Sequence, residues 1–233
     1  MASDSLIKEE VYRSDCYKVK KCKFERAPKF FVDIGANVGW FSKLIDNNFK
    51  NCKILSYELD EANFEILERR MNGYDRTNSV RVFNTAVIGA NGFSKYWKSK
   101  DNIGGHKPIF HGTSSYISED ALTESMKKSL DLKGKFVETS VNKITLPQII
   151  EKNKIDYVDF LKLDCEGSEY EILNYAMDKG ICGKILNMVA EIHGKSQPQY
   201  KTFLKRMKEN FEQVSVRGKI LTATNKIIKG EIK

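Results

Sequence analysis

The chain has few of the features that mark secreted, disulfide-bonded or membrane-spanning proteins. It contains only five cysteines in 233 residues. They are scattered and form no C-x-x-C pair, which indicates reduced thiols in a cytoplasmic protein. The first residues form no apolar run, so no secretory signal is expected. No stretch approaches the length of a membrane span. The cysteines are Cys16, Cys22, Cys52, Cys165 and Cys182.

Acidic residues are in the minority. The 39 basic and 31 acidic side chains give a net charge of +8, which suits an anionic partner such as nucleic acid, a charged glycan or a membrane surface. The bases do not form one long block, however. The densest cluster lies at residues 18–23, and solvated surface lysines account for most of the excess without any functional role.

Strand and helix patterns alternate along most of the chain. At this length we expect one α/β domain over residues 28–233, preceded by an N-terminal arm or lid at 1–27. The alternation predicts a Rossmann-like, mostly parallel sheet with helices on both faces. An antiparallel C-terminal pair at 211–217 and 219–224 is expected at the sheet edge. The other predicted strands are 29–34, 53–58, 80–87, 157–163 and 184–192, and the predicted helices are 39–49, 60–72, 145–153, 167–178 and 197–210.

A tight glycine turn follows the first predicted strand. Residues 32–39 read Val-Asp-Ile-Gly-Ala-Asn-Val-Gly, and Glu58 stands at the end of the next strand, about 19 residues past Gly39. In α/β proteins such a turn lets the backbone approach an adenosine-bearing cofactor, and the acid takes the ribose hydroxyls. Asp33 would repel a pyrophosphate, and the G-x-G-x-x-G pattern of dinucleotide folds lacks a glycine here. The pattern therefore favours S-adenosylmethionine (SAM) over NAD.

Two more strand ends carry ionisable residues. A lysine inside a buried strand is costly unless paired, so we expect Lys162 to meet a carboxylate. Asp164 and Glu166 follow it at the carboxyl edge, where they can orient the cofactor, bind a divalent cation or serve as a base. Glu191 and His193 close the next strand, with a spacing that places both side chains on one face.

His193 is one of only three histidines. Because histidine titrates near neutrality, we predict that His193 is the general base for a hydroxyl acceptor, assisted by Asp164 or Glu191. A metal-dependent alternative uses Asp164, Glu166 and His193 as ligands of a divalent cation.

Residues 97–135 interrupt the alternation of strands and helices. The segment begins rich in glycine, serine, threonine and aromatic residues, which is typical of a loop. Loops at the carboxyl ends of strands bind ligands in such folds, so we expect this insertion to hold the acceptor. Within and after it, a helix at 119–132 and a strand at 136–142 are predicted. The predicted acceptor-binding residues are Trp97, His106, Phe110, His111 and Tyr116.

Together these segments resemble the FkbM family of SAM-dependent methyltransferases. The resemblance covers roughly residues 29–193. Its most specific part is the run Lys-Leu-Asp-Cys-Glu-Gly-Ser-Glu that begins at Lys162. The matching residues are Val32–Gly39, Tyr57-Glu58, Asn84–Val87, Thr145-Leu146, Leu161–Glu169 and Glu191–His193.

The resemblance implies a class I methyltransferase fold and O-methylation, commonly of sugar or polyketide hydroxyls. It also implies roles for individual residues. The methionine end of SAM would be lined by Asp33, Gly35, Asn37 and Gly39, the ribose held by Glu58, and the adenine flanked by Asn84, Thr85 and Ala86. The residues implied to face the transfer site are Asp164, Glu166, Glu191 and His193.

We therefore expect an enzyme, a SAM-dependent O-methyltransferase that modifies a sugar hydroxyl in a glycan or a glycosylated metabolite and releases S-adenosylhomocysteine. An RNA 2′-O-methyltransferase is the main alternative, because the charge of +8 suits phosphates and Lys162, Asp164 and Glu191 supply the residue types. No aromatic-basic platform for stacked bases is visible, however. A non-catalytic SAM-binding module is the other alternative. An NAD oxidoreductase is least favoured.

Overall fold

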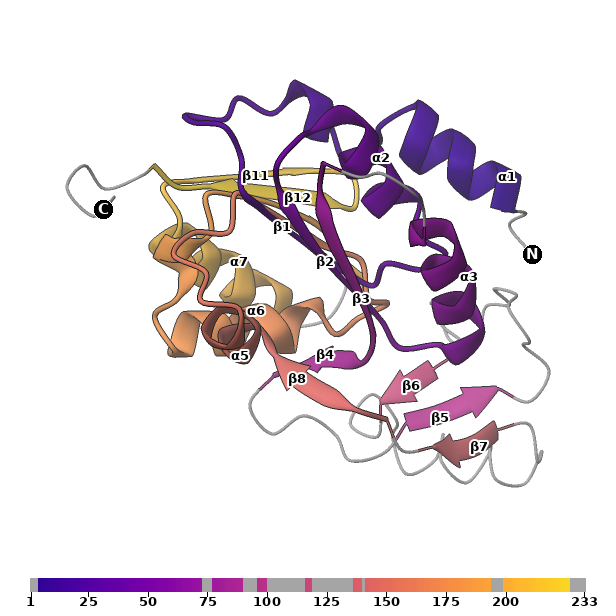
Figure 1. Ribbon diagram of the computed structural model, residues 1–233. Helices are drawn as coiled ribbons and strands as arrows, with labels where there is room; N and C mark the ends of the chain where they lie inside the picture. Colours follow the sequence, from indigo (N-terminus) through magenta and orange to yellow (C-terminus); the bar gives the residue numbers. More distant parts are fainter. Residues whose placement is uncertain are drawn as a thin grey trace.

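The computed structural model describes residues 4–72, 77–89, 96–99, 116–118, 136–139, 141–193 and 199–226. Its centre is a seven-stranded sheet in the order β11-β12-β10-β9-β1-β2-β3, which crosses the middle of the molecule (Figure 1). The strands from β3 to β10 in this order are parallel, and β12 and β11 are antiparallel. The predicted mixed sheet with an antiparallel edge pair is therefore confirmed. The strands are β1 (Phe30–Ile34), β2 (Lys53–Glu58), β3 (Ser79–Asn84), β9 (Phe160–Leu163), β10 (Asn187–Glu191), β11 (Gln213–Arg217) and β12 (Ile220–Thr224).

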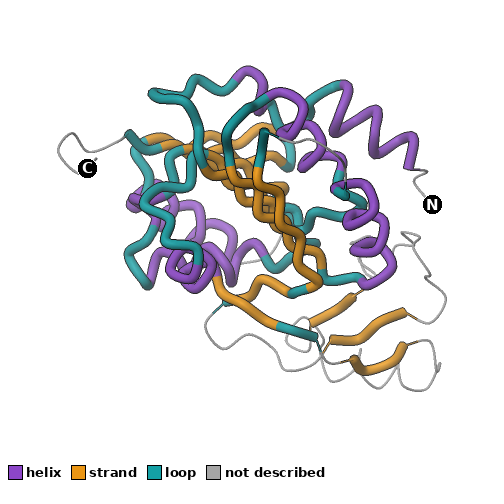
Figure 2. Tube along the Cα trace, in the orientation of Figure 1, coloured by secondary structure: helices purple, strands orange, loops and turns teal. Residues whose placement is uncertain are grey.

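Helices cover both faces of this sheet (Figure 2). The period of two along each buried strand explains the two layers, because alternate side chains enter opposite faces. Phe31 of β1 packs in a cluster with side chains of α2, whereas Val32 packs in the larger cluster formed with α5, α6 and α7. The helices are α2 (Trp40–Asn48), α3 (Glu61–Met71), α5 (Leu146–Lys152), α6 (Glu169–Asp178) and α7 (Gln199–Asn210).

Two helix starts are capped by side chains. The Asp60 carboxylate accepts a hydrogen bond from the backbone N–H of Asn63 at the start of α3. Thr145 and Gln148 form a reciprocal capping box at the start of α5, where Pro147 occupies the first turn. These contacts satisfy backbone donors that the helix itself leaves free, which fixes where each helix begins.

The single strand predicted at 80–87 is wrong. The chain forms β3 up to Asn84 and then a separate strand, β4 (Ala86–Ile88), which pairs with β8 (Lys143–Thr145) in a two-stranded sheet. The break occurs because Thr85 N still bonds to the carbonyl of Glu58 on β2, whereas Ala86 N bonds to the carbonyl of Asn142. An unbroken apolar pattern cannot reveal such a change of partner strand.

The first residues pack against the face of α2. They form α1 (Asp4–Ile7), the π-helical turn η1 (Lys8–Arg13) and the short helix η2 (Val19–Lys21). Tyr17 and Val19 are buried in the cluster that contains Phe31. The segment predicted as an N-terminal arm or lid thus contains short helical turns and buried residues.

The insertion predicted as a loop contains regular structure. A three-stranded antiparallel sheet is formed by β5 (Tyr96–Ser99), β6 (Tyr116–Ser118) and β7 (Phe136–Thr139), in the order β6-β5-β7. It lies below the main sheet in the view of Figure 1. The strand predicted at 136–142 corresponds in part to β7. The helix predicted at 119–132 lies outside the described residues.

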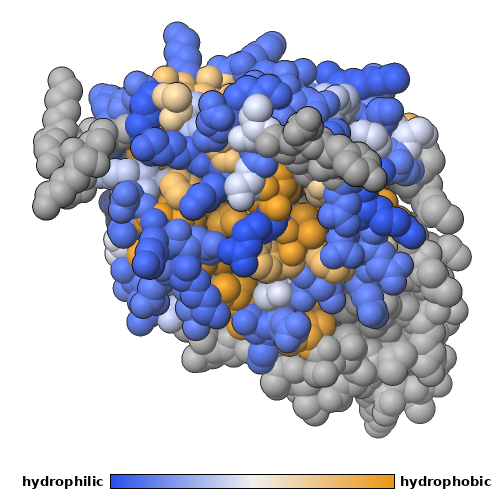
Figure 3. All heavy atoms as spheres, in the orientation of Figure 1, coloured by the Kyte–Doolittle hydropathy of each residue, from blue (hydrophilic) through white to orange (hydrophobic). Residues whose placement is uncertain are grey.

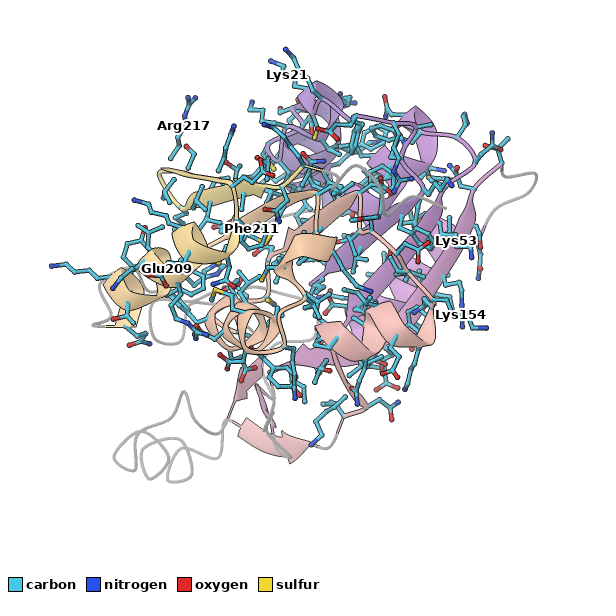
Figure 4. All side chains as sticks on the ribbon, turned by 90° about the vertical axis from the view of Figure 1, so that its left-hand side faces the viewer. Lys21, Lys53, Lys154, Glu209, Phe211 and Arg217 are labelled. Atoms are coloured by element: carbon cyan, nitrogen blue, oxygen red, sulfur yellow. The ribbon has the colours of Figure 1, made fainter. Side chains whose placement is uncertain are left out.

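Polar residues dominate the coloured part of the face in Figure 3. Figure 3 shows hydrophilic residues over much of one face, with hydrophobic residues near its centre over the strands, consistent with β3 being a half-buried edge strand. In Figure 4 the exposed bases Lys21, Lys53, Lys154 and Arg217 project from separate elements. None of the helices in the described part of the chain is long and apolar enough to cross a membrane.

We predict that Gly35→Ala destabilises the fold far more than Gly180→Ala. Both glycines have left-handed φ, +73° and +64°, which costs an alanine about 1–2 kcal/mol. A Cβ on Gly35 would also lie 1.8 Å from the backbone oxygen of Asp164, whereas no described atom lies within 4 Å of a Cβ on Gly180. The free energy of unfolding in urea should fall by about 3 kcal/mol or more for Gly35→Ala and by about 1 kcal/mol for the control. Equal losses of unfolding free energy in the two variants would contradict the close approach of Gly35 to the backbone of Asp164.

Candidate active site

The turn between β1 and α2 is built from residues that tolerate left-handed backbone. Gly35, Asn37 and Gly39 have φ of +73°, +52° and +90°. At Gly35 the turn touches the backbone of Asp164, at the end of β9. A Cβ on Gly39 would lie 2.6 Å from the Leu67 side chain of α3. Both glycines are therefore required by close contacts as well as by the backbone conformation.

Glu58 closes this turn from the neighbouring strand. Its Oε2 accepts a hydrogen bond from Asn37 N at 2.7 Å, and its Oε1 accepts one from Asp60 N at 2.8 Å. Burial raises the pKa of Glu58 to about 7, against the opposing effect of these two backbone donors. Each carboxylate oxygen has a second lone pair, so both can accept a further hydrogen bond from a ligand hydroxyl.

Below the turn lies a buried ion pair. Lys162 Nζ is 3.3 Å from Asp33 Oδ1, an ion pair whose atoms are not aligned for a hydrogen bond. Lys162 Nζ also donates a hydrogen bond to the carbonyl of Gly35 at 2.6 Å. Asp33 Oδ2 accepts from the Ser42 hydroxyl at 2.6 Å. Burial lowers the pKa of Lys162, but the charges of Asp33 and Asp164 outweigh it and the net shift is upward. The expectation that Lys162 meets a carboxylate is confirmed.

Asp33 has no exposed surface. Its carboxylate faces Lys162 and Ser42 in the protein interior. Its predicted contact with the methionine end of a cofactor stays a prediction.

Asp164, Glu166 and His193 come together at the ends of β9 and β10. One ligand atom from each lies within 4.8 Å of the others, as the metal-dependent alternative requires. Glu166 adopts φ +54°, an uncommon conformation for a residue with a side chain. It brings Glu166 Oε2 to 3.4 Å from His193 Nε2.

Glu169, for which no role was predicted, organises this cluster. It is fully buried and accepts hydrogen bonds from the backbone N–H of Cys165 and of Gly167. His193 Nδ1 lies 3.1 Å from Glu169 Oε1. The carboxylate therefore fixes both the β9–α6 turn and the imidazole ring, whose Nε2 is left facing Glu166 and Glu191. The sequence signal was an acid in the first turn of α6.

The carboxylates around His193 favour its charged form. Burial lowers the pKa of His193, but the hydrogen bond with Glu169 and the negative charges of Glu169, Glu166 and Asp164 outweigh this and raise it to about 9. Glu191 Oε1 lies 3.8 Å from His193 Nε2 and 3.5 Å from Lys219 Nζ. Burial and the charge of Asp164 raise the pKa of Glu191, although His193 and Lys219 oppose them.

Tyr17 is a second residue that sequence reasoning missed. Its hydroxyl donates a hydrogen bond to Asp164 Oδ2 at 2.7 Å, across 147 residues of sequence. Nothing in the polar N-terminal sequence indicates this contact.

The remaining predicted residues are only partly placed. Asn84 lies at the end of β3, where its side chain donates to the carbonyls of Glu58 and Leu59, and Thr85 and Ala86 follow it directly. Trp97 and Tyr116 lie on the adjacent strands β5 and β6. Three of the predicted acceptor-binding residues lie outside the described residues: His106, Phe110 and His111.

The fold and this edge of the sheet define the class of protein. A mostly parallel sheet with an antiparallel edge pair, a glycine turn after β1 and an acid at the end of β2 form the Rossmann-like fold of methyltransferases. The chain belongs to the FkbM methyltransferase family, since the model of the methyltransferase FkbM domain matches residues 33–214.

Two proteins illustrate what this chain is similar to in sequence and in fold. A methyltransferase named sdnD from Sordaria araneosa is 23% identical over 194 residues, which cover 79% of this chain and 73% of that protein. The solved structure of methyltransferase FkbM from Methylobacillus flagellatus KT matches with a TM-score of 0.51 at 16% identity, over 89% of this chain. The match covers 46% of that structure, so this chain spans about half its length.

We predict that Lys162→Met lowers the free energy of unfolding by about 3–5 kcal/mol, because it leaves the Asp33 carboxylate buried without its charge partner. The double variant Lys162→Met/Asp33→Asn should recover part of this loss. Urea unfolding measures both. The exposed pair of Lys205 and Glu209 provides the control, since Lys205→Met should change little. A similar loss in single and double variants would argue against a specific ion pair.

Proposed function

We propose that this methyltransferase uses SAM and transfers its methyl group to a hydroxyl of a sugar, in a glycan or a glycosylated metabolite. The observation that carries the proposal is the placement of His193. It is oriented by buried Glu169 and shares a cluster with Asp164, which borders the glycine turn. A proton acceptor next to a cofactor turn is what O-methylation of an unactivated hydroxyl requires.

The residues around the turn fit SAM. Glu58 retains lone pairs for the two ribose hydroxyls, and Gly35 and Gly39 let the turn pack closely against Asp164 and Leu67. The carboxylates of Asp164, Glu166 and Glu191 suit a ligand that carries positive charge. When bound, SAM supplies an activated methyl group on a sulfonium, so the protein has to position the acceptor and remove its proton.

His193 is the proposed base, with Glu169 holding its Nδ1. With a pKa of about 9, the ring of the ligand-free protein is mostly protonated at neutral pH. The positive charge of a bound sulfonium opposes that proton, because two like charges at short range repel each other. Asp164 and Glu191 then stabilise the imidazolium that forms when His193 takes the hydroxyl proton.

The acceptor is proposed to lie against the insertion. Trp97 and Tyr116 stand on paired strands, and with Phe110 they would provide aromatic faces for a sugar ring, while His106 and His111 would provide polar contacts. The site carboxylates disfavour a phosphate backbone, and the bases labelled in Figure 4 are spread over several elements. Both points favour a sugar over RNA as acceptor.

Incubation with methyl-labelled SAM tests this proposal. At one salt concentration, we expect label in a pool of deoxysugar-containing oligosaccharides and none in unmodified RNA. Label in RNA would favour the 2′-O-methyltransferase alternative. Binding of SAM without transfer to either pool would favour a non-catalytic module.

His193→Ala should lower the transfer rate by about 10²–10⁴-fold, the contribution typical of a general base, while SAM binding persists. Full turnover in this variant would exclude His193 as the base.

The same assay after exhaustive chelation with EDTA distinguishes a direct base from the metal-dependent alternative, in which Asp164, Glu166 and His193 hold a divalent cation. If His193 acts directly as the base, activity survives chelation.

The affinity for S-adenosylhomocysteine should increase with pH from 6 to 8. The pKa of Glu58 is raised to about 7, so at pH 6 about nine-tenths of this group is protonated. Ribose hydroxyls donate more strongly to the ionised form, which accumulates as the pH rises through 7. Calorimetry should show an affinity about tenfold lower at pH 6 than at pH 8, and Glu58→Gln should remove this dependence. If the affinity of Glu58→Gln still increased with pH as in the unaltered protein, another group would be responsible for the pH dependence.

A further inference from the structure

The N-terminal segment reaches the edge of the sheet where the proposed methyl transfer occurs. Tyr17 is 5% exposed, and its ring meets Phe41 of α2 edge-on at a centroid distance of 5.6 Å. Its hydroxyl is directed at Asp164 Oδ2 at 2.7 Å. Tyr17, which belongs to the segment before β1, therefore donates a hydrogen bond to a carboxylate at the edge where the parallel strands end.

The backbone around Tyr17 is held in place locally. The Asp15 carboxylate accepts hydrogen bonds from Val19 N and Lys20 N, each at 3.0 Å. Val19 is fully buried beside the sheet. The turn that carries Tyr17 is therefore fixed by its own capping and by the core, so its ring is delivered in one orientation.

Asp164 is in turn joined to the cofactor turn. Its backbone N–H bonds to the carbonyl of Ile34, and its own carbonyl lies against Gly35. Lys162, which binds the carbonyl of Gly35, has its Nζ 5.5 Å from the centre of the Tyr17 ring. Lys162 and Asp164 therefore connect Tyr17 to the glycine turn.

Tyr17 acts as a donor rather than as a base. Burial and the neighbouring charge of Asp164 raise the pKa of its phenol well above the usual value, so the hydroxyl keeps its proton. Among the described residues, the charged groups that act on it include Asp164, Lys162 and Glu191. A neutral donor to a carboxylate restricts the rotation of that carboxylate.

We propose that Tyr17 is a positioning residue of the methyl-transfer site, which fixes the Asp164 carboxylate beside the cofactor turn and makes the N-terminal segment part of the catalytic unit. This inference rests on the proposed function, because Asp164 must serve cofactor or acceptor for its orientation to matter. Tyr17 itself need not touch either ligand.

The test compares Tyr17→Phe with Tyr12→Phe. Both variants remove one hydroxyl from the same segment, but the Tyr12 hydroxyl accepts a hydrogen bond from Asn47 Nδ2 on α2. Tyr17→Phe should raise the Kd for S-adenosylhomocysteine and the KM for SAM about tenfold, the loss expected when a hydrogen bond to a charged group is removed. Tyr12→Phe should leave both constants unchanged.

A double-variant cycle separates positioning from general stability. In an Asp164→Ala background, Tyr17→Phe should cause no further loss of affinity, because its target is gone. Equal losses in both backgrounds, or no loss in Tyr17→Phe alone, would overturn the inference. Thermal unfolding of each variant shows that the protein is folded. If the unaltered protein fails to bind S-adenosylhomocysteine, the proposed function fails, and the inference fails with it.

Discussion

The candidate site depends on the buried pair of Lys162 and Asp33. The pair joins β9 to β1 in register, and Lys162 also holds the carbonyl of Gly35 at the start of the turn. Taking two charges out of water is unfavourable, so a buried pair adds little net stability compared with apolar residues of the same size. Its value lies in specificity, because only one arrangement of strand and turn satisfies both charges. The pair thereby fixes the glycine turn against the end of β9, where Asp164 lies.

The distribution of charge separates the site from the rest of the surface. The chain carries a net charge of +8, yet Asp164, Glu166, Glu169 and Glu191 surround a single histidine. A polyanion would meet favourable bases over much of the surface and repulsion at the site. A cationic cofactor would instead be attracted by the carboxylates of the site. Under the proposed function, the local arrangement of carboxylates therefore matters more for ligand choice than the net charge does.

Local patterns in the sequence predicted the elements but not the contacts between distant segments. Most strands and helices of the main sheet and the glycine turn after β1 depend on residues close in sequence, and they were predicted within a few positions. The split of β3 from β4 depends on competition between Glu58 and Asn142 for neighbouring backbone donors, which no local pattern records. Tyr17 and Asp164 are 147 residues apart. Glu169 was part of a quoted motif, but its role requires the position of His193.

The arrangement that orients His193 also opposes its proposed chemistry. Glu169 must bind Nδ1 to aim the ring, yet that bond and the nearby carboxylates hold a proton on the imidazole and raise its pKa to about 9. A base that is protonated in the free protein becomes competent when a positive charge enters its surroundings. If the cofactor is SAM, its sulfonium is such a charge, and its departure as neutral thioether would restore the proton affinity of the ring. The base would then be active only while a methyl group is available, and the carboxylate cluster would couple acceptor deprotonation to cofactor binding.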